Sequence, residues 1–319
     1  MVEKNVVNTT KQVNNLQSNV DKVLVEIQID EKKDLKSLLD CYDSGWISVG
    51  GEKVKAFEKL ICKITGAKYS IAVSSGTAGL HLSLKALNIN KKHEILIPAL
   101  NYIASSNATI YCDAIPHFID IEKKTLGVDC NKLEKYLLTN TFFKNKKTYN
   151  KNTKRLIKAI IPTHMFGHAV NMTELKKIAK RFNLRIIEDA SEALGSYYKG
   201  KHLGTIGQIG VISFNGNKII TTGGGGIVIT NNKVLANKVR HLSNVGKVYK
   251  KYETEHDIVA FNYKMPNINA VLGIAQLENL KKFVKFKRNL FIKYKKKLSK
   301  FTAIKVFEDT PDEKSNYWL

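Results

Sequence analysis

Lys218 lies between an apolar segment and a run of four glycines, in the stretch SFNGNKIITTGGGG at residues 213–226. A lysine amine must be unprotonated to attack a carbonyl, and free lysine, whose pKa is about 10.4, is almost wholly charged at neutral pH. Partial burial and nearby cations release the lone pair. The glycines cost backbone entropy on folding, which indicates a backbone that passes close to a ligand. Lys218 is therefore a candidate nucleophile; the alternative is a lysine that extends from an edge strand into solvent.

Two further candidate groups follow apolar segments. The residues SSGTAG at 74–79 stand at the expected start of a helix, where free backbone N–H groups and hydroxyls bind phosphate. The same residues would also serve as an ordinary helix cap. Asp189 ends the apolar segment of IIEDASEA, where a buried carboxylate is costly unless a cation meets it. It is a candidate partner for a protonated ring nitrogen, with a helix N-cap as the alternative.

The three groups together predict a pyridoxal phosphate site. This cofactor requires a Schiff-base lysine, a carboxylate for its pyridinium nitrogen and an anchor for its phosphate. Lys218 would be the covalent tether, and the glycines would let the backbone approach cofactor and substrate. Open α/β sheets place such ligands at the carboxyl ends of their strands.

The segments around these residues alternate between two patterns. Short apolar runs predict strands, and runs with a helical period predict helices. Alternation at this interval indicates parallel crossovers, and therefore an α/β sheet with helices on both faces. Residues 139–155, rich in Lys, Asn and Thr, are expected to form a mobile surface loop. Strands are expected within 69–76, 93–99, 114–121, 156–164, 184–190, 208–216 and 225–231, and helices within 54–68, 77–89, 103–112, 171–183, 232–243 and 268–300.

We expect a large α/β domain that binds the cofactor at residues 50–245. Residues 1–49 would form an arm or helices that contribute to a smaller domain, and residues 246–319 would begin that C-terminal domain. Because the chain ends at KSNYWL, which has the composition of a strand, we expect the small domain to be incomplete.

The composition is that of a globular protein with an excess of positive charge. The chain has 319 residues, 52 of them basic and 28 acidic, for a net charge of +24. The lysines are scattered and no nucleic-acid motif accompanies them, so we interpret the excess as solvated surface charge and expect no nucleic-acid partner. No apolar run is long enough to span a membrane, and the polar N-terminus is no secretory signal. The four cysteines lack metal-binding spacing, so we expect no metal and a cytoplasmic location.

Five motifs carry a resemblance to a known family. They are SSGTAGL, IPALNYIASSNA, IIEDASEALGSYYKGKHLGTIG, SFNGNKIITTGGGG and NYKMPNINAVLGIAQL, in this order. From about Tyr42 onward the chain resembles the DegT/DnrJ/EryC1/StrS sugar aminotransferases. The residues of the segments GWISVGGEKVKAFE and FNGNKIITTGGGG are most similar to those of the LegC-like branch, which aminates C4 of a nucleotide sugar. The resemblance implies the fold type I of the aspartate aminotransferase superfamily, with a mostly parallel seven-stranded sheet and a smaller domain.

The resemblance also implies roles for single residues. Lys218 would form the Schiff base, and Asp189 would keep the ring nitrogen protonated. Asn262 would reach the phosphate of a neighbouring subunit, which implies a homodimer with shared active sites. The remaining residues would contact the cofactor through its phosphate, its ring face or its ring hydroxyl: Gly76, Thr77, Ser213, Tyr102 and Glu192.

The implied reaction moves an amino group from L-glutamate to C4 of a UDP- or GDP-linked 4-keto-6-deoxy sugar. The product would serve a bacterial surface polysaccharide or lipopolysaccharide, as legionaminic acid, bacillosamine or perosamine does. One alternative is a sugar dehydratase that uses the same cofactor; it would carry histidine in place of Lys218. The other is a catalytically impaired, truncated paralogue. Lys264, where the family has arginine, and His164 and Trp46 keep open roles.

Overall fold

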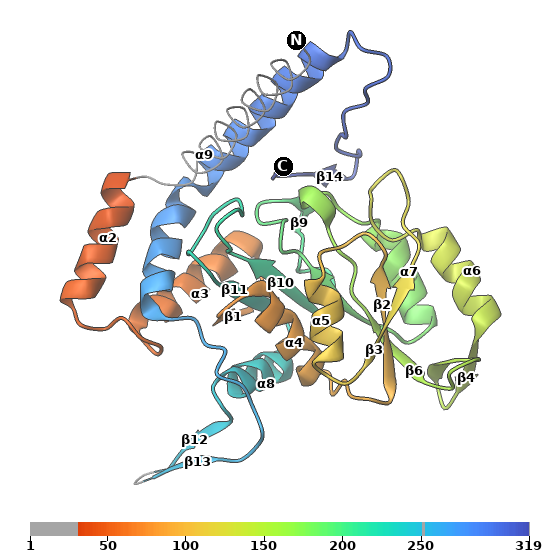
Figure 1. The fold of residues 1–319 in the computed structure, drawn as a ribbon, viewed down its shortest axis with the longest axis horizontal. Coiled ribbons are helices and arrows are strands. Elements are labelled where there is room, and N and C mark those ends of the chain that lie inside the picture. The colour runs from red at the N-terminus through yellow and green to blue at the C-terminus, as the bar shows by residue number, and fades with distance from the viewer. Residues whose placement is uncertain (1–30, 251–252, 319) are drawn as a thin grey trace, which may run out of the picture.

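A computed structural model describes residues 31–250 and 253–318. Its centre is a sheet whose main path runs in the order β1-β11-β10-β7-β6-β2-β3 (Figure 1). All pairs from β10 to β3 are parallel, while β11 runs antiparallel to both of its neighbours. The predicted mostly parallel sheet is confirmed, and its main path has the predicted seven strands. Its strands are β1 Tyr69–Val73, β2 His93–Pro98, β3 Ile115–Ile119, β6 Leu156–Ile160, β7 Arg185–Asp189, β10 Ile209–Ser213 and β11 Gly226–Thr230.

Helices cover both faces of this sheet, because successive strand residues point to opposite sides. In β2, Leu96 packs into one apolar core, and Ile95 and Ile97 pack into the other. The first core contains residues of α3 Glu52–Thr65, α6 Cys130–Asn140, α7 Met172–Arg181 and α9 Asn267–Leu298. The second contains residues of α4 Gly76–Ala86, α5 Ala104–Ile110 and α8 Lys233–Ser243.

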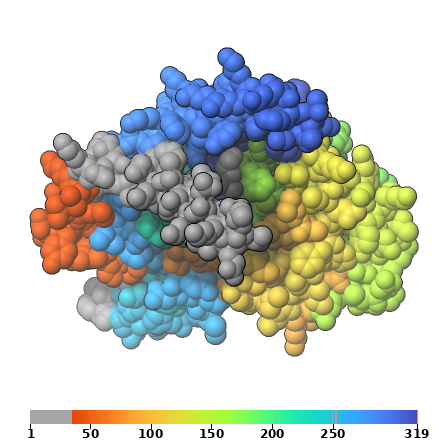
Figure 2. All heavy atoms as spheres, turned by 45° about the horizontal axis from the view of Figure 1, so that its top comes forward, coloured from red at the N-terminus to blue at the C-terminus, as the bar shows by residue number. Residues whose placement is uncertain are grey.

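The long helix α9 leads away from the sheet. Its first half packs against α3 and against α2 Glu31–Asp43, and its second half extends past the sheet before the chain turns back (Figure 1). Figure 2 shows the C-terminal residues, in blue, along the top of one face. The prediction for residues 1–30 lies outside the described residues.

The prediction of a mobile loop at residues 139–155 is wrong. This segment contains a hairpin of β4 Thr141–Lys144 and β5 Lys147–Asn150, and β5 pairs with β6, so the sheet has nine strands. Asn145 and Lys146 both have positive φ, as a two-residue turn of type I′ requires. The rings of Phe142 and Tyr149 stack across the strands with centroids 5.5 Å apart. The aromatic pair and the tight turn outweigh the polar composition that suggested a loop.

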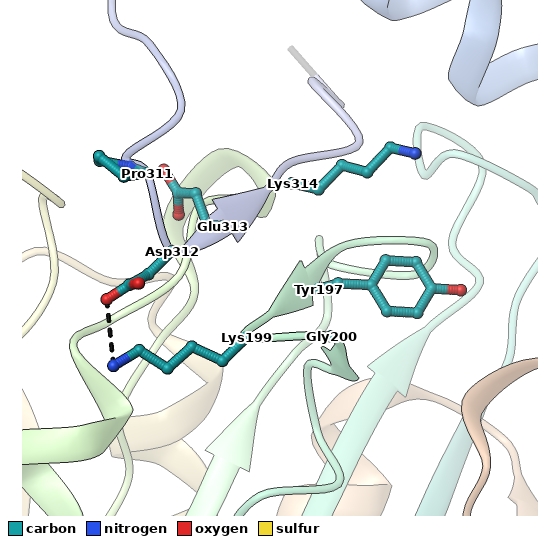
Figure 3. Close-up of a pocket in the computed structure, with 7 residues that line it drawn as sticks. All are labelled: Tyr197, Lys199, Gly200, Pro311, Asp312, Glu313 and Lys314. Carbon is teal, nitrogen blue, oxygen red and sulfur yellow. Dashed lines mark ion pairs between the residues drawn. The ribbon is translucent and has the colours of Figure 1, made fainter.

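A separate three-stranded sheet, in the order β14-β8-β9, joins residues 313–314 to the segment that follows β7. Strand β14 Glu313–Lys314 pairs with β8 Tyr197–Tyr198, which pairs with β9 Lys201–His202. Figure 3 shows the shallow surface pocket beside this junction, with Lys199 Nζ 3.3 Å from Asp312 Oδ2. Elsewhere β12 Lys247–Tyr249 pairs with β13 Thr254–His256, and the 3-10 turn η1 spans Met165–Gly167. The division at residues 49 and 245 stays a prediction.

Gly210 allows a close approach in the middle of β10, which suggests a test of the packing there. A Cβ at this position would lie 2.0 Å from the carbonyl oxygen of Gly204, which is backbone and has little freedom to move. We expect Gly210→Ala to lower the free energy of unfolding by about 1–3 kcal/mol or more, measured by urea denaturation. Gly216→Ala is the matched control, because its Cβ would meet no atom within 4 Å. Equal stability of the two variants would contradict the packing described here.

Candidate active site

A pocket of about 360 Å³ lies at the carboxyl ends of the strands and gathers most of the predicted site residues. Seven of the eight candidates line it: Gly76, Thr77, Tyr102, Asp189, Glu192, Ser213 and Lys218. These residues come from segments up to 142 positions apart, as the numbers 76 and 218 show, so the sheet topology brings them together. Such a meeting of polar groups at strand ends is typical of ligand sites in α/β sheets.

One end of the pocket is formed by the start of α4. Ser75 is the N-cap, and its hydroxyl accepts a hydrogen bond from the N–H of Ala78. The first N–H groups of a helix have no intrahelical acceptor, and Gly76 and Thr77 line the pocket. A Cβ on Gly76 would lie 3.0 Å from Cβ of Ser213, so a larger residue would crowd the cradle. The arrangement suits an anion such as a phosphate.

Asp189 lies at the end of β7 with its side chain held from two sides. Ser105 Oγ donates to Oδ2 at 3.0 Å, and the N–H of Ser191 donates to Oδ1 at 3.2 Å. The residue is only 3% exposed. Thr163, which follows β6, forms an isolated parallel bridge with Asp189 and also lines the pocket. Its buried hydroxyl has no partner among the described residues. An oriented buried carboxylate next to an unsatisfied hydroxyl fits a cationic, hydrogen-bonding ligand.

Lys218 meets Glu192 inside the pocket. Lys218 Nζ lies 3.4 Å from Glu192 Oε1, while Glu192 Oε2 accepts a hydrogen bond from the N–H of Phe166 at 2.7 Å. Burial raises the pKa of Glu192, and the attraction of Lys218 only partly opposes this effect. The carboxyl is therefore poised to bind a proton more readily than an exposed glutamate.

Asn262, the eighth candidate, lies outside this pocket, as do Trp46 and Lys264, whose roles were left open. Asn262 is exposed and forms an isolated bridge with Asn244, so it does not reach the pocket of its own chain. Trp46 is 58% exposed, and its carbonyl accepts from Asn267 Nδ2. Lys264 forms a bridge with Val73 through its backbone.

His164 has a structural place beneath the pocket. Its Nε2 lies 3.0 Å from Glu188 Oε2, and both side chains are fully buried. Glu188 also accepts hydrogen bonds from the N–H groups of Gly204 and Ile206 at 2.9 and 2.6 Å, and from Gly207. Burial alone would raise the pKa of Glu188, but the bond from His164 and the backbone donors outweigh it and lower the pKa. This pair holds the loop after β9 against β7.

Sequence reasoning missed the residues that complete the pocket. Trp318 lies in its wall although it is 100 positions from Lys218, and Ser191 and Thr163 line it as well. Of these three residues, only Ser191 could have been suspected from the sequence, because it lies in the polar motif that follows β7. Nothing in the sequence placed Trp318 near the lysine.

The described residues contain one group of metal-ligating side chains: His168, Asp309 and Glu313. Arg288 NH2 lies 2.9 Å from Asp309 Oδ2, and Glu313 accepts from the N–H groups of Ala169 and Thr310. The carboxylates are thus already engaged, and the cluster ties Glu313 to the loop between η1 and α7. No helix in the described parts of the chain has the length and apolar character of a membrane span.

The model of the DegT/DnrJ/EryC1/StrS aminotransferase family matches residues 28–319. The chain belongs to this family. It is 38% identical over 288 residues to a GDP-perosamine synthase of Escherichia coli O157:H7, covering 90% of this chain and 74% of that protein. It is 36% identical over 285 residues to a GDP-perosamine synthase of Vibrio cholerae, covering 89% and 72%.

Solved structures confirm the predicted fold type I architecture. A family aminotransferase from Brucella abortus superposes with a TM-score of 0.81 at 25% identity, over 90% of this chain and 74% of that one. The enzyme is an aminotransferase that depends on pyridoxal 5′-phosphate. The residues present fit this cofactor, because the pocket combines the start of α4 and a lysine 3.4 Å from Glu192 with the carboxylate of Asp189. It also contains the hydroxyl of Thr163, which has no partner within the described residues.

The buried pair under the pocket predicts a pH-dependent stability. Because the folded-state pKa of Glu188 lies below its ordinary value of about 4.5, its contribution is complete above that value and is lost as the pH falls through the folded pKa. We expect Glu188→Gln to lower the free energy of unfolding by about 1–3 kcal/mol at pH 7. The difference in this free energy between the variant and wild type should become smaller as the pH falls. Urea denaturation at several pH values measures this. Glu134→Gln, which breaks an exposed pair with Arg181, is the control and should change little; a gap independent of pH would contradict the assignment.

Proposed function

We propose that this enzyme transfers an amino group from L-glutamate to C4 of a 4-keto-6-deoxy sugar linked to GDP. The observation that carries the proposal is the meeting of Lys218, Asp189 and the start of α4 in one pocket. The names of the perosamine synthases favour GDP over UDP and perosamine over the other sugars considered. The LegC-like assignment stays a prediction. All four cysteines are free, in keeping with a cytoplasmic enzyme, which we also propose.

Each predicted residue has a task in this proposal. The cofactor, when bound, supplies an aldehyde that a lysine amine can capture and a ring that accepts electrons. Gly76, Thr77 and Ser213 would hold its phosphate, where the positive end of the α4 dipole favours an anion. Tyr102, which is 71% exposed at the pocket mouth, would cover the face of the ring.

Lys218, Asp189 and Glu192 would stabilise the charge of the ring nitrogen and transfer protons. Asp189 would accept a hydrogen bond from the protonated ring nitrogen, which keeps that nitrogen cationic. Lys218 Nζ would accept a proton from the donor amino acid and return it later as a general acid. Glu192, with its raised pKa, would take up or release a proton next to that amine.

Trapping of the cofactor tests the role of Lys218. Wild-type protein incubated with pyridoxal phosphate and then reduced with borohydride should carry the cofactor on the peptide that contains Lys218, as mass spectrometry would show. Lys218→Ala should lose this adduct and amino transfer by a factor of at least about 1,000, since the covalent step has no substitute. Lys177→Ala, at an exposed lysine paired with Glu174, should behave as wild type. An adduct that persists in Lys218→Ala would overturn the assignment. Product masses from GDP- and UDP-linked ketosugars would then identify the acceptor.

We further propose a homodimer in which Asn262 of one subunit completes the site of the other. Asn262 is exposed and absent from its own pocket. Near the pocket mouth, large apolar side chains at the two ends of α5 are exposed, as expected for a face that a second subunit covers: Tyr102, Ile103, Ile110 and Tyr111.

Complementation between two inactive variants tests the shared site. Lys218→Ala and Asn262→Ala, each expressed alone, should be impaired in amino transfer. Co-expression should restore about a quarter of wild-type activity, because half of the dimers are mixed and each has one intact site. Light scattering would report the dimer directly. The absence of any recovery, in a sample shown to contain mixed dimers, would refute the shared site.

A further inference from the structure

Trp318 lies against the candidate nucleophile. The centroid of its ring is 4.1 Å from Lys218 Nζ, and Glu192 Oε1 lies 3.4 Å from the same nitrogen. The tryptophan is only 6% exposed and lines the pocket. An ammonium group this close to an indole face is attracted by the ring quadrupole. The amine is thus held between an aromatic surface and a carboxylate.

The indole itself is fixed at both ends. Its Nε1 donates to the carbonyl of Asn217 at 2.6 Å, the residue immediately before the lysine. Its backbone N–H donates to Oδ1 of Asn316 at 2.9 Å. A ring anchored at its edge and at its backbone has little rotamer freedom left, so it forms a rigid wall.

Asn316 connects this wall to the loop that follows β7. The side chain is fully buried, and its Nδ2 donates to the carbonyls of Glu192 and Leu194 at 2.8 and 2.9 Å. Its backbone N–H donates to Ser196 Oγ at 2.9 Å. The end of the chain therefore ties the loop that carries Glu192 to the loop that carries Lys218. The two loops follow different strands, β7 and β10, and Asn316 and Trp318 link them.

We propose that Trp318 is a positioning residue for Lys218: its ring holds the amine in the pocket in the geometry that captures the cofactor. This inference rests on the proposed function of Lys218. Without the ring, the four side-chain torsions of the lysine regain freedom and water reaches the amine. That freedom must be lost again when the amine captures the cofactor. The entropy cost of immobilising a lysine side chain typically lowers the equilibrium constant for such a step about tenfold.

The test separates covalent capture from binding. Covalent capture of pyridoxal phosphate is followed by borohydride trapping over a range of cofactor concentrations. Non-covalent affinity is measured with 4′-deoxypyridoxine 5′-phosphate, which has no aldehyde and cannot react with an amine. We expect Trp318→Leu to need about tenfold more pyridoxal phosphate for half-maximal trapping, while its affinity for the deoxy analogue stays within about twofold. Trp318→Phe, which keeps an aromatic face, should recover most of the loss.

A second readout uses the only other tryptophan. The sequence has two, and Trp46 is exposed and outside the pocket. Trp46→Phe is therefore the matched control, expected to trap cofactor as wild type does. In that variant all indole emission comes from Trp318, and we expect pyridoxal phosphate to quench most of it. Emission that the cofactor leaves unchanged would place the ring away from the site and overturn the inference.

The outcomes distinguish the inference from the function on which it rests. Unchanged trapping in Trp318→Leu overturns the positioning role while the proposed function stands. Equal losses of trapping and of deoxy-analogue affinity indicate general damage to the pocket and also overturn it. A wild-type protein that binds the analogue but never traps the cofactor refutes the proposed function of Lys218, and the inference falls with it.

Discussion

Two consecutive carboxylates at the end of a buried strand are the constraint on which this site depends. Glu188 and Asp189 end β7, and strand geometry turns their side chains to opposite sides. Glu188 meets His164 and three backbone N–H groups, while Asp189 enters the pocket with hydrogen bonds from Ser105 and the N–H of Ser191. Burial of either charge is costly unless it is paired. The surrounding loops are therefore arranged to meet these charges on both sides of the sheet.

The two carboxylates have different roles: Glu188 supports the structure, and Asp189 faces the ligand pocket. Glu188 is fully satisfied within the chain, and its lowered pKa reflects that satisfaction. Asp189 and its neighbour Glu192 face a pocket in which the hydroxyl of Thr163 has no partner among residues 31–250 and 253–318. Burial raises the pKa of Glu192. Polar groups that lack partners in the folded chain lower its stability, and a bound ligand supplies the missing hydrogen bonds and charges.

The sequence predicted the sheet well because buried parallel strands give short, nearly continuous apolar runs. It also indicated Lys218 and Asp189, whose positions at strand ends carry chemical meaning. The hairpin at β4 and β5 was missed because its stability comes from the pairing of Phe142 with Tyr149 and from a turn without glycine. Trp318 was missed because its contact with Lys218 joins residues 100 positions apart, which no local pattern reports. The task predicted for Asn262 depends on a second copy of the chain, which single-chain reasoning leaves untested.

The contacts of Asn316 and Trp318 with the loops that follow β7 and β10 have a consequence for biosynthesis. Chains emerge from the ribosome N-terminus first, and domains generally fold as units in that order. The strands that carry Asp189 and precede Lys218 are complete well before Asn316 and Trp318 have been made. A nascent chain can therefore form its layered core while the wall around the lysine is still missing. Completion of the pocket therefore follows formation of this core and awaits the translation of residues 316–318.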